Sequence, residues 1–441
     1  MVLRKTQSLC PVCLGKIDAE IVEEEDGVYL AKTCLDHGNF KTVLWRGSGD
    51  FFLIWDRYAE NGGGPGGDLS EIKKGCPYDC GPCLAHTGGI CVALIEVTHR
   101  CNMRCPICFS SSPEVPAFEP DIEAIKRLYR TILATGTTPP LQFSGGEPTL
   151  RDDLPEIAAA ASDLGFEMIQ INTNGVRLAE DTRYLLKLKE NGVKVLYLQF
   201  DGVTDDVYRA IRGSPLVNTK IKVIENCSNI GLAVVLVPTI VPGINDSQIG
   251  RIVQFAKQWM PIVRGVHFQP VSYFGRYPQA PDNRERITLP EVLNALEKQT
   301  DGEVRISDFK PRRSKDAHCA FAGFFVLGDD GALISAFSPV VRSTSKPAAA
   351  VRRFLETHWS PTPRRCSCQP CSCGMDSIPD ELLNWVQAHS LTISGMPFQD
   401  VWNIDLERLE GCCIHVATDG SLVPFCAYYL TSIRGKRLYH R

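Results

Sequence analysis

The stretch Glu96-Val-Thr-His-Arg-Cys-Asn-Met-Arg-Cys-Pro-Ile-Cys-Phe109 decides the fold and the chemistry of this 441-residue chain. It places Cys101, Cys105 and Cys108 in one loop, with three and then two residues between them. Three thiolates at this spacing can bind three irons of a 4Fe–4S cubane and leave the fourth iron without a protein ligand. A zinc knuckle or part of a ferredoxin-type site uses similar spacing, so the triplet alone leaves these alternatives open.

The residues around this loop alternate between short apolar runs and helical patterns. The run Val92–Val97 leads into the triplet and is the first of six predicted strands. Strands that alternate with helices imply a parallel sheet, and six such units predict an α/β fold with an open, partial (βα)6 barrel. Ligand sites in such folds lie at the carboxyl ends of the strands, where the triplet stands. The other predicted strands are Leu141–Phe143, Met168–Asn172, Val195–Phe200, Ala233–Ile240 and Val266–Val271, and the predicted helices include Asp121–Ala134, Asp152–Leu164 and Asp246–Met260.

Polar residues and glycines follow the next three predicted strands. The adjacent glycines of the second strand end let the backbone approach a ligand closely, and the glutamate beside them can accept from a ligand ammonium group. Short hydrogen-bonding side chains at the third and fourth strand ends suit a ribose and a carboxylate. Each of these motifs alone also fits an ordinary loop. The predicted cofactor-binding residues are Ser144, Gly145, Gly146, Glu147, Pro148, Asn172, Asn174 and Asp201.

With these motifs in this order, residues 92 to 275 resemble the radical S-adenosylmethionine (SAM) superfamily. The resemblance implies that Cys101, Cys105 and Cys108 hold a 4Fe–4S cluster and that SAM chelates its open iron. It also implies that Gly145 to Pro148 hold the amino group of the SAM methionine. Reductive cleavage of SAM then gives a 5′-deoxyadenosyl radical. Ile107 stands where the family usually has an aromatic residue, and it keeps an apolar cover over the cluster.

The remaining cysteines form further groups, which favours metal binding because thiols of cytosolic proteins stay reduced. Three thiols and an imidazole near the N-terminus suit zinc or a mononuclear iron. A second group, placed just before the barrel, is predicted to bind an auxiliary 4Fe–4S cluster without an open iron, with zinc as the alternative. A third, C-terminal group is sufficient for one or two more clusters, or for a zinc site with spare thiols. The three groups are Cys10, Cys13, Cys34 and His37; Cys76, Cys80, Cys83 and Cys91; and Cys366, Cys368, Cys371, Cys373, Cys412, Cys413 and Cys426.

Composition excludes some functions. The net charge is −4 and no long basic run occurs, so a nucleic-acid partner is not expected. No apolar stretch is long enough to span a bilayer, and no apolar segment precedes the first cysteines, so we expect a cytoplasmic protein that is not an integral membrane protein. The predicted domains are an N-terminal zinc-ribbon or rubredoxin-like domain (1–60), an auxiliary cluster segment (68–92), the core barrel (93–290) and a C-terminal cysteine-rich domain (291–441), with a glycine-rich linker at residues 61–67.

The whole chain resembles the class D radical SAM methyltransferases, whose best-known member acts on a pterin, and the related tetraether lipid synthases. The motifs that carry this resemblance are Cys10-Pro-Val-Cys13, Gly75-Cys-Pro-Tyr-Asp-Cys-Gly-Pro-Cys83 and Pro424-Phe-Cys-Ala-Tyr428. The resemblance implies hydrogen abstraction from an unactivated carbon and methylation of a pterin-like small molecule, with a reduced-folate-type one-carbon donor. It also implies a reductase with ferredoxin or flavodoxin as the electron source. Carbon–carbon coupling of a lipid substrate and a non-catalytic role in electron transfer or maturation are the alternatives. The stretch Ser335–Ala350 departs from the family pattern.

Overall fold

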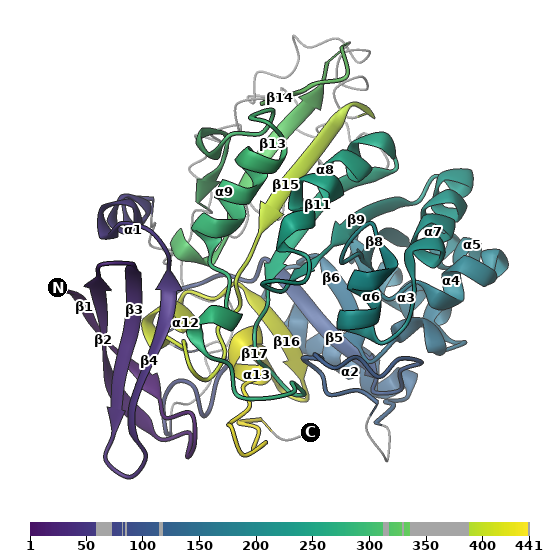
Figure 1. Cartoon of the computed structure of the whole chain (residues 1–441). Coiled ribbons are helices and arrows are strands. Elements are labelled where there is room, and N and C mark those ends of the chain that lie inside the picture. The colour runs from purple at the N-terminus through teal and green to yellow at the C-terminus, as the bar shows by residue number, and fades with distance from the viewer. Residues whose placement is uncertain are drawn as a thin grey trace, which may run out of the picture.

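The computed structural model of the chain describes residues 1–58, 73–81, 83, 86–113, 118–311, 317–328, 330–335 and 388–439. Its main element is a large sheet whose six central strands run parallel, in the order β11-β9-β8-β7-β6-β5 (Figure 1). The predicted α/β fold with a partial barrel is thereby confirmed. The six strands are β5 (Val92–Thr98), β6 (Leu141–Gly145), β7 (Ile169–Thr173), β8 (Val193–Gln199), β9 (Ala233–Val237) and β11 (Val263–Pro270).

Helices connect these strands and cover one face of the sheet. The helix α2 (Ile122–Leu133) illustrates how the sequence forms such a helix. Asp121 caps its first turn by accepting from the backbone N–H of Ala124, and apolar residues recur on the face that it buries. The other helices of the barrel are α3 (Leu154–Asp163), α4 (Val176–Glu180), α5 (Thr182–Glu190), α6 (Asp205–Arg212), α7 (Val217–Ile230) and α8 (Ile249–Gln258).

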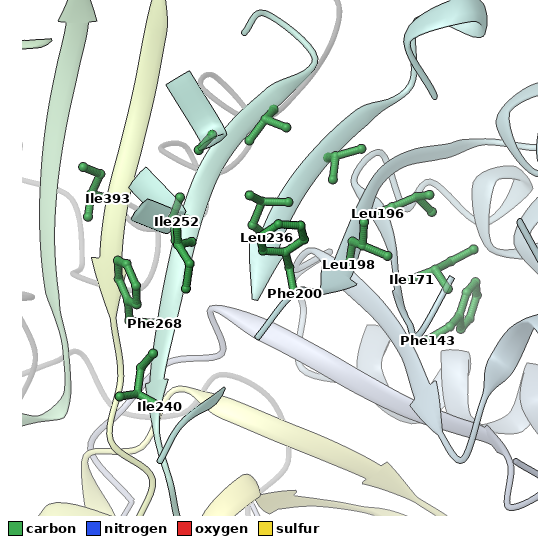
Figure 2. Packing of buried hydrophobic residues seen from close by; sticks show 14 of the residues in the cluster. Phe143, Ile171, Leu196, Leu198, Phe200, Leu236, Ile240, Ile252, Phe268 and Ile393 are labelled. Carbon is green, nitrogen blue, oxygen red and sulfur yellow. The ribbon is translucent and has the colours of Figure 1, made fainter. Parts of the chain in front are cut away.

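The core lies between the sheet and these helices. Successive strand residues point to opposite faces of the sheet. One set of alternate residues is apolar and packs against the helices, and the other set points toward the inside of the barrel. Phe143, Leu196 and Phe268 belong to the helix-facing set and are fully buried (Figure 2). Burial of this face fixes the register of every strand, because a slip by one residue would turn the whole set inward.

The C-terminal part of the chain extends the sheet at both edges, which the sequence did not predict. β15 (Ser390–Gly395) lies parallel to β11, and β16 (Ile414–Thr418) lies parallel to β5. Both strands are short and are buried along most of their length, so neither shows a clear alternation in the sequence. Antiparallel strands continue the sheet outward: β12 (Lys310–Pro311), β13 (Phe321–Leu327), β14 (Leu333–Ser335) and β17 (Ser421–Pro424), while the short β10 (Thr239–Ile240) pairs with β11.

The N-terminal residues form a separate antiparallel sheet beside the barrel (Figure 1). It contacts the segment that precedes β16: Ser8 donates to the backbone oxygen of Ile404, and the buried Lys32 donates to that of Val401. No helix among the described ranges is long and apolar enough to cross a membrane. The sheet comprises β1 (Val2–Leu9), β2 (Lys16–Glu24), β3 (Gly27–Cys34) and β4 (Gly38–Trp45); three further helices are α1 (Gly49–Asp56), α9 (Leu289–Gln299) and α12 (Leu406–Glu410).

Candidate active site

The loop that carries the three cysteines is held by the turn after β6. The backbone N–H of Gly146 donates to the oxygen of Thr98 at 2.7 Å, and that of Glu147 donates to the oxygen of Arg100 at 2.8 Å. These two hydrogen bonds fix the chain immediately before Cys101. The Gly-Gly-Glu turn is therefore a support for the cysteine loop.

Both glycines of this turn are required by close backbone contact. A Cβ atom on Gly146 would lie 2.1 Å from the oxygen of Arg100, and one on Gly145 would lie 2.2 Å from that of Thr98. Gly145 also has a φ of +120°, which residues with a side chain rarely adopt. No larger residue fits at either position without moving the cysteine loop.

The structure brings the three thiols of the loop together at the end of β5. Burial raises the pKa of Cys101 to about 12, with smaller contributions from the charges of Glu147, Cys105 and Cys108. Their sulfur atoms are not within 4.8 Å of one another as a set, which among the described residues holds only for the Cys10 group. A single zinc at about 2.3 Å from each sulfur needs closer ligands. The donor set therefore fits the larger cubane, which would be held by Cys101, Cys105 and Cys108.

Arg212 lies beside this loop, although the sequence analysis did not select it. Burial raises the pKa of the Cys105 thiol, and the Arg212 guanidinium opposes that rise. Asp201 orients the guanidinium through two hydrogen bonds of 2.7 and 2.8 Å, and both side chains are almost completely buried. The Asp201 carboxylate also accepts from the backbone N–H of Thr239. Asp201 is thus engaged by the protein, and its partner Arg212 places a positive charge beside the cysteine loop.

Glu147 is completely buried and organises the ends of β6 and β7. One of its oxygens accepts from Thr149 and from the hydroxyl of Thr173, and the other accepts from the backbone N–H of Asn174. Burial raises the pKa of this carboxyl, and these hydrogen bonds oppose the rise. The amide of Asn174 in turn donates to the side chain of Asn102, one residue after the first cysteine.

A buried lysine supports the same strand ends. Lys220 donates to the backbone oxygen of Asn174 at 2.6 Å, and burial lowers its pKa to about 8. The predicted residues Ser144 and Asn172 are also neighbours, since the Asn172 amide donates to the Ser144 hydroxyl at 3.4 Å. Six of the predicted positions therefore meet at one end of the sheet: Ser144, Gly145, Gly146, Glu147, Asn172 and Asn174.

A C-terminal helix closes against the inner face of β5. Glu96 is buried there, and its two oxygens accept from the hydroxyls of Tyr428 and Tyr429 at 2.9 and 2.6 Å. His99 lies 3.4 Å from the same carboxylate. Tyr428 belongs to α13 (Phe425–Tyr428), which also carries Cys426. The tail of the chain is thus part of the site wall.

The inner face of the sheet carries polar side chains beside buried apolar ones, among them Leu94, Val195 and Val235. Parallel register places Glu96 beside Ser144, Asn172 beside Tyr197, and Gly265 beside Thr392. On the same face the side-chain amide of Gln142 donates to the side-chain oxygen of Gln170. The buried Gln170 amide nitrogen and the Thr392 hydroxyl have no hydrogen-bond partner among the described residues. The further inward-facing polar residues are Gln199, His267, Gln269 and Ser394.

The N-terminal sheet carries a compact metal-type site. The ligand atoms of Cys10, Cys13, Cys34 and His37 all lie within 4.8 Å of one another. Backbone N–H groups of Val12 and Gly15 donate to the sulfurs of Cys10 and Cys13, which is favourable for thiolates. The hydrogen bond with His37 lowers the pKa of Cys34 to about 7. Three sulfurs and one imidazole at this spacing suit a tetrahedral zinc or iron.

The other predicted ligands are partly gathered. The Cys76 and Cys80 thiols are close enough for each to shift the pKa of the other, and Cys83 follows in the same loop. The partly buried Cys412 and the buried Cys426 are close enough for the pKa of each to be raised by the charge of Cys319. The predicted ligands Cys366, Cys368, Cys371 and Cys373 lie outside the described residues.

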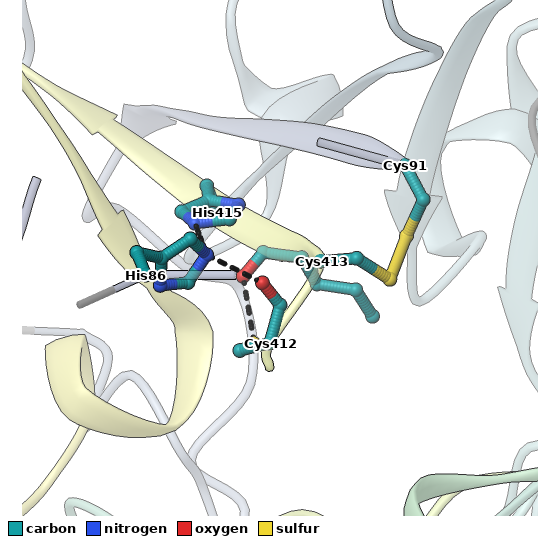
Figure 3. Close-up of a disulfide and its surroundings, with 6 residues drawn as sticks. His86, Cys91, Cys412, Cys413 and His415 are labelled. Carbon is teal, nitrogen blue, oxygen red and sulfur yellow. Dashed lines mark hydrogen bonds between the residues drawn. A yellow bond between two sulfur atoms is a disulfide. The ribbon is translucent and has the colours of Figure 1, made fainter. Parts of the chain in front are cut away.

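Two predicted ligands have a different role in the structure. Cys91 was predicted to complete the Cys76 group and Cys413 to bind a C-terminal cluster, but a disulfide joins them (Figure 3). The cause is the pairing of β5 with β16, since the backbone N–H of Cys91 donates to the oxygen of Cys413 at 2.7 Å. While the disulfide is formed neither sulfur can bind a metal, so the predicted ligand roles of Cys91 and Cys413 apply to the reduced pair and stay predictions. His86 and His415 lie next to this pair (Figure 3).

A partial parallel barrel with a glycine-supported three-cysteine loop at its strand ends defines an enzyme that uses an iron–sulfur cluster and SAM. Comparison with known proteins agrees: residues 95–256 match the model of the radical SAM superfamily, and residues 2–46 match the HMPTM N-terminal zinc ribbon domain.

A relative covers nearly the whole chain. The 7,8-dihydro-6-hydroxymethylpterin dimethyltransferase of Methanocaldococcus jannaschii is 37% identical over 96% of this chain and 93% of its own length. A probable GTP 3′,8-cyclase of Archaeoglobus fulgidus is 30% identical over 42% of this chain and 62% of its own length. Among solved structures, methylornithine synthase is 16% identical, with a TM-score of 0.37 over 63% of this chain and 84% of its own. The chain belongs to the radical SAM superfamily, in the methyltransferase family of the first of these relatives.

The predicted radical SAM chemistry and the predicted enzyme class are thereby confirmed. When bound, the 4Fe–4S cluster supplies the electron that cleaves SAM into methionine and a 5′-deoxyadenosyl radical. The protein's own contribution is to hold the loop, to exclude water and to orient the ligands of the site. An enzyme of this superfamily requires an external electron donor.

Proposed function

We propose that this enzyme methylates a small, polar ring compound of the pterin type and takes the new carbon from a separate reduced-folate-type donor. The observation that carries the proposal is the polar inner face of the sheet. A ring with amide-like donors and acceptors needs partners of this kind, because buried polar groups that stay unpaired cost about 1–3 kcal/mol each. The unpartnered Gln170 amide nitrogen and Thr392 hydroxyl are suitable partners. The relative from Methanocaldococcus jannaschii, a 7,8-dihydro-6-hydroxymethylpterin dimethyltransferase, supports the same substrate class.

The roles of the site residues follow from their placement. We propose that Cys101, Cys105 and Cys108 hold the cluster and that Arg212 binds the carboxylate of SAM. The Gly145–Pro148 turn is proposed to receive its amino group, and Ser144 with Asn172 to bind its ribose. Support comes from the position of Arg212 next to Cys105 and from the contact of the turn with Thr98 and Arg100.

The Cys10 group is proposed to bind zinc or a single iron, and the Cys76 and Cys412 groups to bind auxiliary clusters. The proposed electron donor is a ferredoxin or a flavodoxin, and the proposed location is the cytoplasm.

In the proposed reaction one carbon–hydrogen bond of the substrate breaks, and the hydrogen leaves in 5′-deoxyadenosine. A new carbon–carbon bond then joins the substrate to the one-carbon group, and the carbon–nitrogen bonds that held this group to the folate-type donor break. The electrons that complete the methyl group and the donor nitrogens come from the electron-donor protein, and the protons come from solvent.

Isotope labelling tests the proposal. The reconstituted enzyme, incubated with SAM, a reduced hydroxymethylpterin and a labelled methylene donor, should give a methylated pterin that carries the label. 5′-Deoxyadenosine should form without S-adenosylhomocysteine, because a carbon radical does not displace a methyl group from sulfur as a nucleophile would. Label that enters from the SAM methyl group would refute the proposal. So would a product in which two lipid chains are joined and that carries no one-carbon label.

A further inference from the structure

The last described residues of the chain fold back onto α13. The backbone N–H of Leu438 donates to the oxygen of Leu430 at 3.1 Å, which closes a short turn. Gly435 lies in this turn with a φ of +77°, a conformation that residues with a side chain rarely adopt. The turn brings Tyr439 back to the helix, where its ring stacks on that of Tyr428 with the centroids 6.4 Å apart.

Ring contacts continue from Tyr428 to the cysteine loop. The ring centroids of Tyr428 and Tyr429 lie 4.9 Å apart, and those of Tyr429 and Phe109 lie 4.8 Å apart. Phe109 directly follows Cys108 in the sequence. Four rings therefore form an unbroken series of contacts, the aromatic chain, which ends at the proposed radical site. Its members are Tyr439, Tyr428, Tyr429 and Phe109.

The other end of the aromatic chain lies at a second cysteine loop. The Tyr439 hydroxyl donates to the backbone oxygen of Pro77 and accepts from the backbone N–H of Cys80, both at 2.7 Å. Pro77 and Cys80 belong to the loop of the Cys76 group, which is proposed to bind an auxiliary cluster. The aromatic chain thus joins two cysteine loops, through hydrogen bonds at one end and a peptide bond at the other.

The middle of the aromatic chain is buried and held in place. Tyr429 is 2% exposed and Tyr428 is 9% exposed. Their hydroxyls donate to the two oxygens of Glu96 at 2.6 and 2.9 Å, and hydrogen bonds to a carboxylate are among the stronger ones in proteins. These bonds fix the orientation of both rings. Tyr439 is partly exposed, so a partner protein can approach this end.

We propose that the aromatic chain carries single electrons from a low-potential electron-donor protein to the Cys101 loop. Electron transfer slows steeply as the gap between donor and acceptor widens, and delocalised ring electrons bridge such a gap better than aliphatic side chains or water. In this step one electron leaves the reduced donor protein near Tyr439 and arrives at the loop beside Phe109, and no bond forms or breaks. The inference rests on the proposed role of Cys101, Cys105 and Cys108, and it is independent of the substrate.

The rate at which the Cys101 cluster is reduced tests the proposal on the reconstituted full-length enzyme, without SAM or substrate. Samples are mixed with a reduced flavodoxin, frozen at successive times and measured by electron paramagnetic resonance; the signal that Cys105→Ala lacks belongs to this cluster. Tyr439→Leu removes a ring of the aromatic chain and should lose most of the parent's rate. Tyr439→Phe keeps the ring and should retain more of it. Tyr58→Leu changes a tyrosine just after α1, outside the aromatic chain, and should behave as the parent does.

Dithionite separates the electron path from structural damage, because this small reductant reaches the cluster without the aromatic chain. It should reduce the cluster equally fast in the parent and in Tyr439→Leu. Equal rates of these two proteins with flavodoxin would overturn the inference, and so would a slower reduction of Tyr439→Leu by both reductants. Failure of flavodoxin to reduce the parent's cluster would overturn it as well.

The proposed function is judged separately by label transfer. Label transfer together with equal flavodoxin rates would refute the electron path and leave the function standing. The expected flavodoxin rates without label transfer would support the path and refute the function alone. A parent that shows no reduced cluster even with dithionite would overturn both, since the Cys101 loop would then hold no such cluster.

Discussion

Substitution of Gly146 by alanine should uncouple the Gly-Gly-Glu turn from the cysteine loop. The new Cβ would lie 2.1 Å from the backbone oxygen of Arg100 and 2.9 Å from that of His99, so backbone has to move. The movement would break the hydrogen bonds from Gly146 to Thr98 and from Glu147 to Arg100. Two such bonds contribute about 1–3 kcal/mol, and relief of the overlap costs about 1–3 kcal/mol more. The total of about 2–6 kcal/mol is smaller than the stability of many domains, so we expect a folded protein with a displaced loop.

The assay is the affinity for SAM of the anaerobically reconstituted variant, together with the yield of 5′-deoxyadenosine under dithionite. A loss of at least about 1.4 kcal/mol, or tenfold in affinity, is expected. The control is Gly136→Ala, because Gly136 also needs a positive φ but has open space around its Cβ and lies outside the site. Unchanged SAM affinity and cleavage in Gly146→Ala would refute the role assigned to the turn.

Three further predictions concern the groups around the loop. Arg212→Ala leaves the buried Asp201 without its partner, so it should cost about 3–5 kcal/mol of stability and abolish measurable SAM binding, whereas Arg212→Lys should bind SAM weakly. Denaturant unfolding measures the stability and equilibrium dialysis measures the binding. Full SAM binding by the alanine variant would contradict the assignment. Glu96→Gln should loosen the C-terminal helix by about 1.5–3 kcal/mol, because one of the two tyrosine hydroxyls then loses its acceptor and the other donates to a neutral oxygen. Faster proteolysis of the tail is the expected sign, and a rate equal to that of the parent would count against it. Removal of metal from the N-terminal sheet by a chelator should expose the thiols of Cys10, Cys13 and Cys34 to alkylation before the barrel unfolds, and equal protection with and without metal would argue against a metal site there.

Local sequence patterns were sufficient to predict much of the fold and part of the site. The alternation of apolar runs with helices predicted the parallel strands, and the triplet with Gly145 to Pro148 predicted the loop and the turn that supports it. These features depend on residues close together in the chain. The predicted strand Ala233–Ile240 is divided at Pro238 into β9 and β10 in the structure, and the partner of Cys91 lies far along the chain. Local patterns predicted neither feature.

The parts that sequence reasoning missed depend on pairings between distant segments. The disulfide between Cys91 and Cys413 spans 322 residues and follows from the pairing of two strands whose partners no local pattern reveals. The hydrogen bond from Tyr428 to Glu96 also joins residues that are 332 positions apart, so no local pattern predicts it. Arg212 carries a weak signal, since it lies on one helix shortly after Asp201, but an arginine on an amphipathic helix is usually read as a solvated residue.

The central claim is that the Cys101 loop generates a radical for a polar ring compound bound against the inner face of the sheet. It is tested most directly by 5′-deoxyadenosine formed per enzyme, with a reduced hydroxymethylpterin or a long-chain lipid as the added compound. We predict that the pterin increases 5′-deoxyadenosine formation by the parent, that the lipid does not, and that Cys105→Ala forms none with either. Stimulation by the lipid alone, or unchanged 5′-deoxyadenosine formation in Cys105→Ala, would contradict the account.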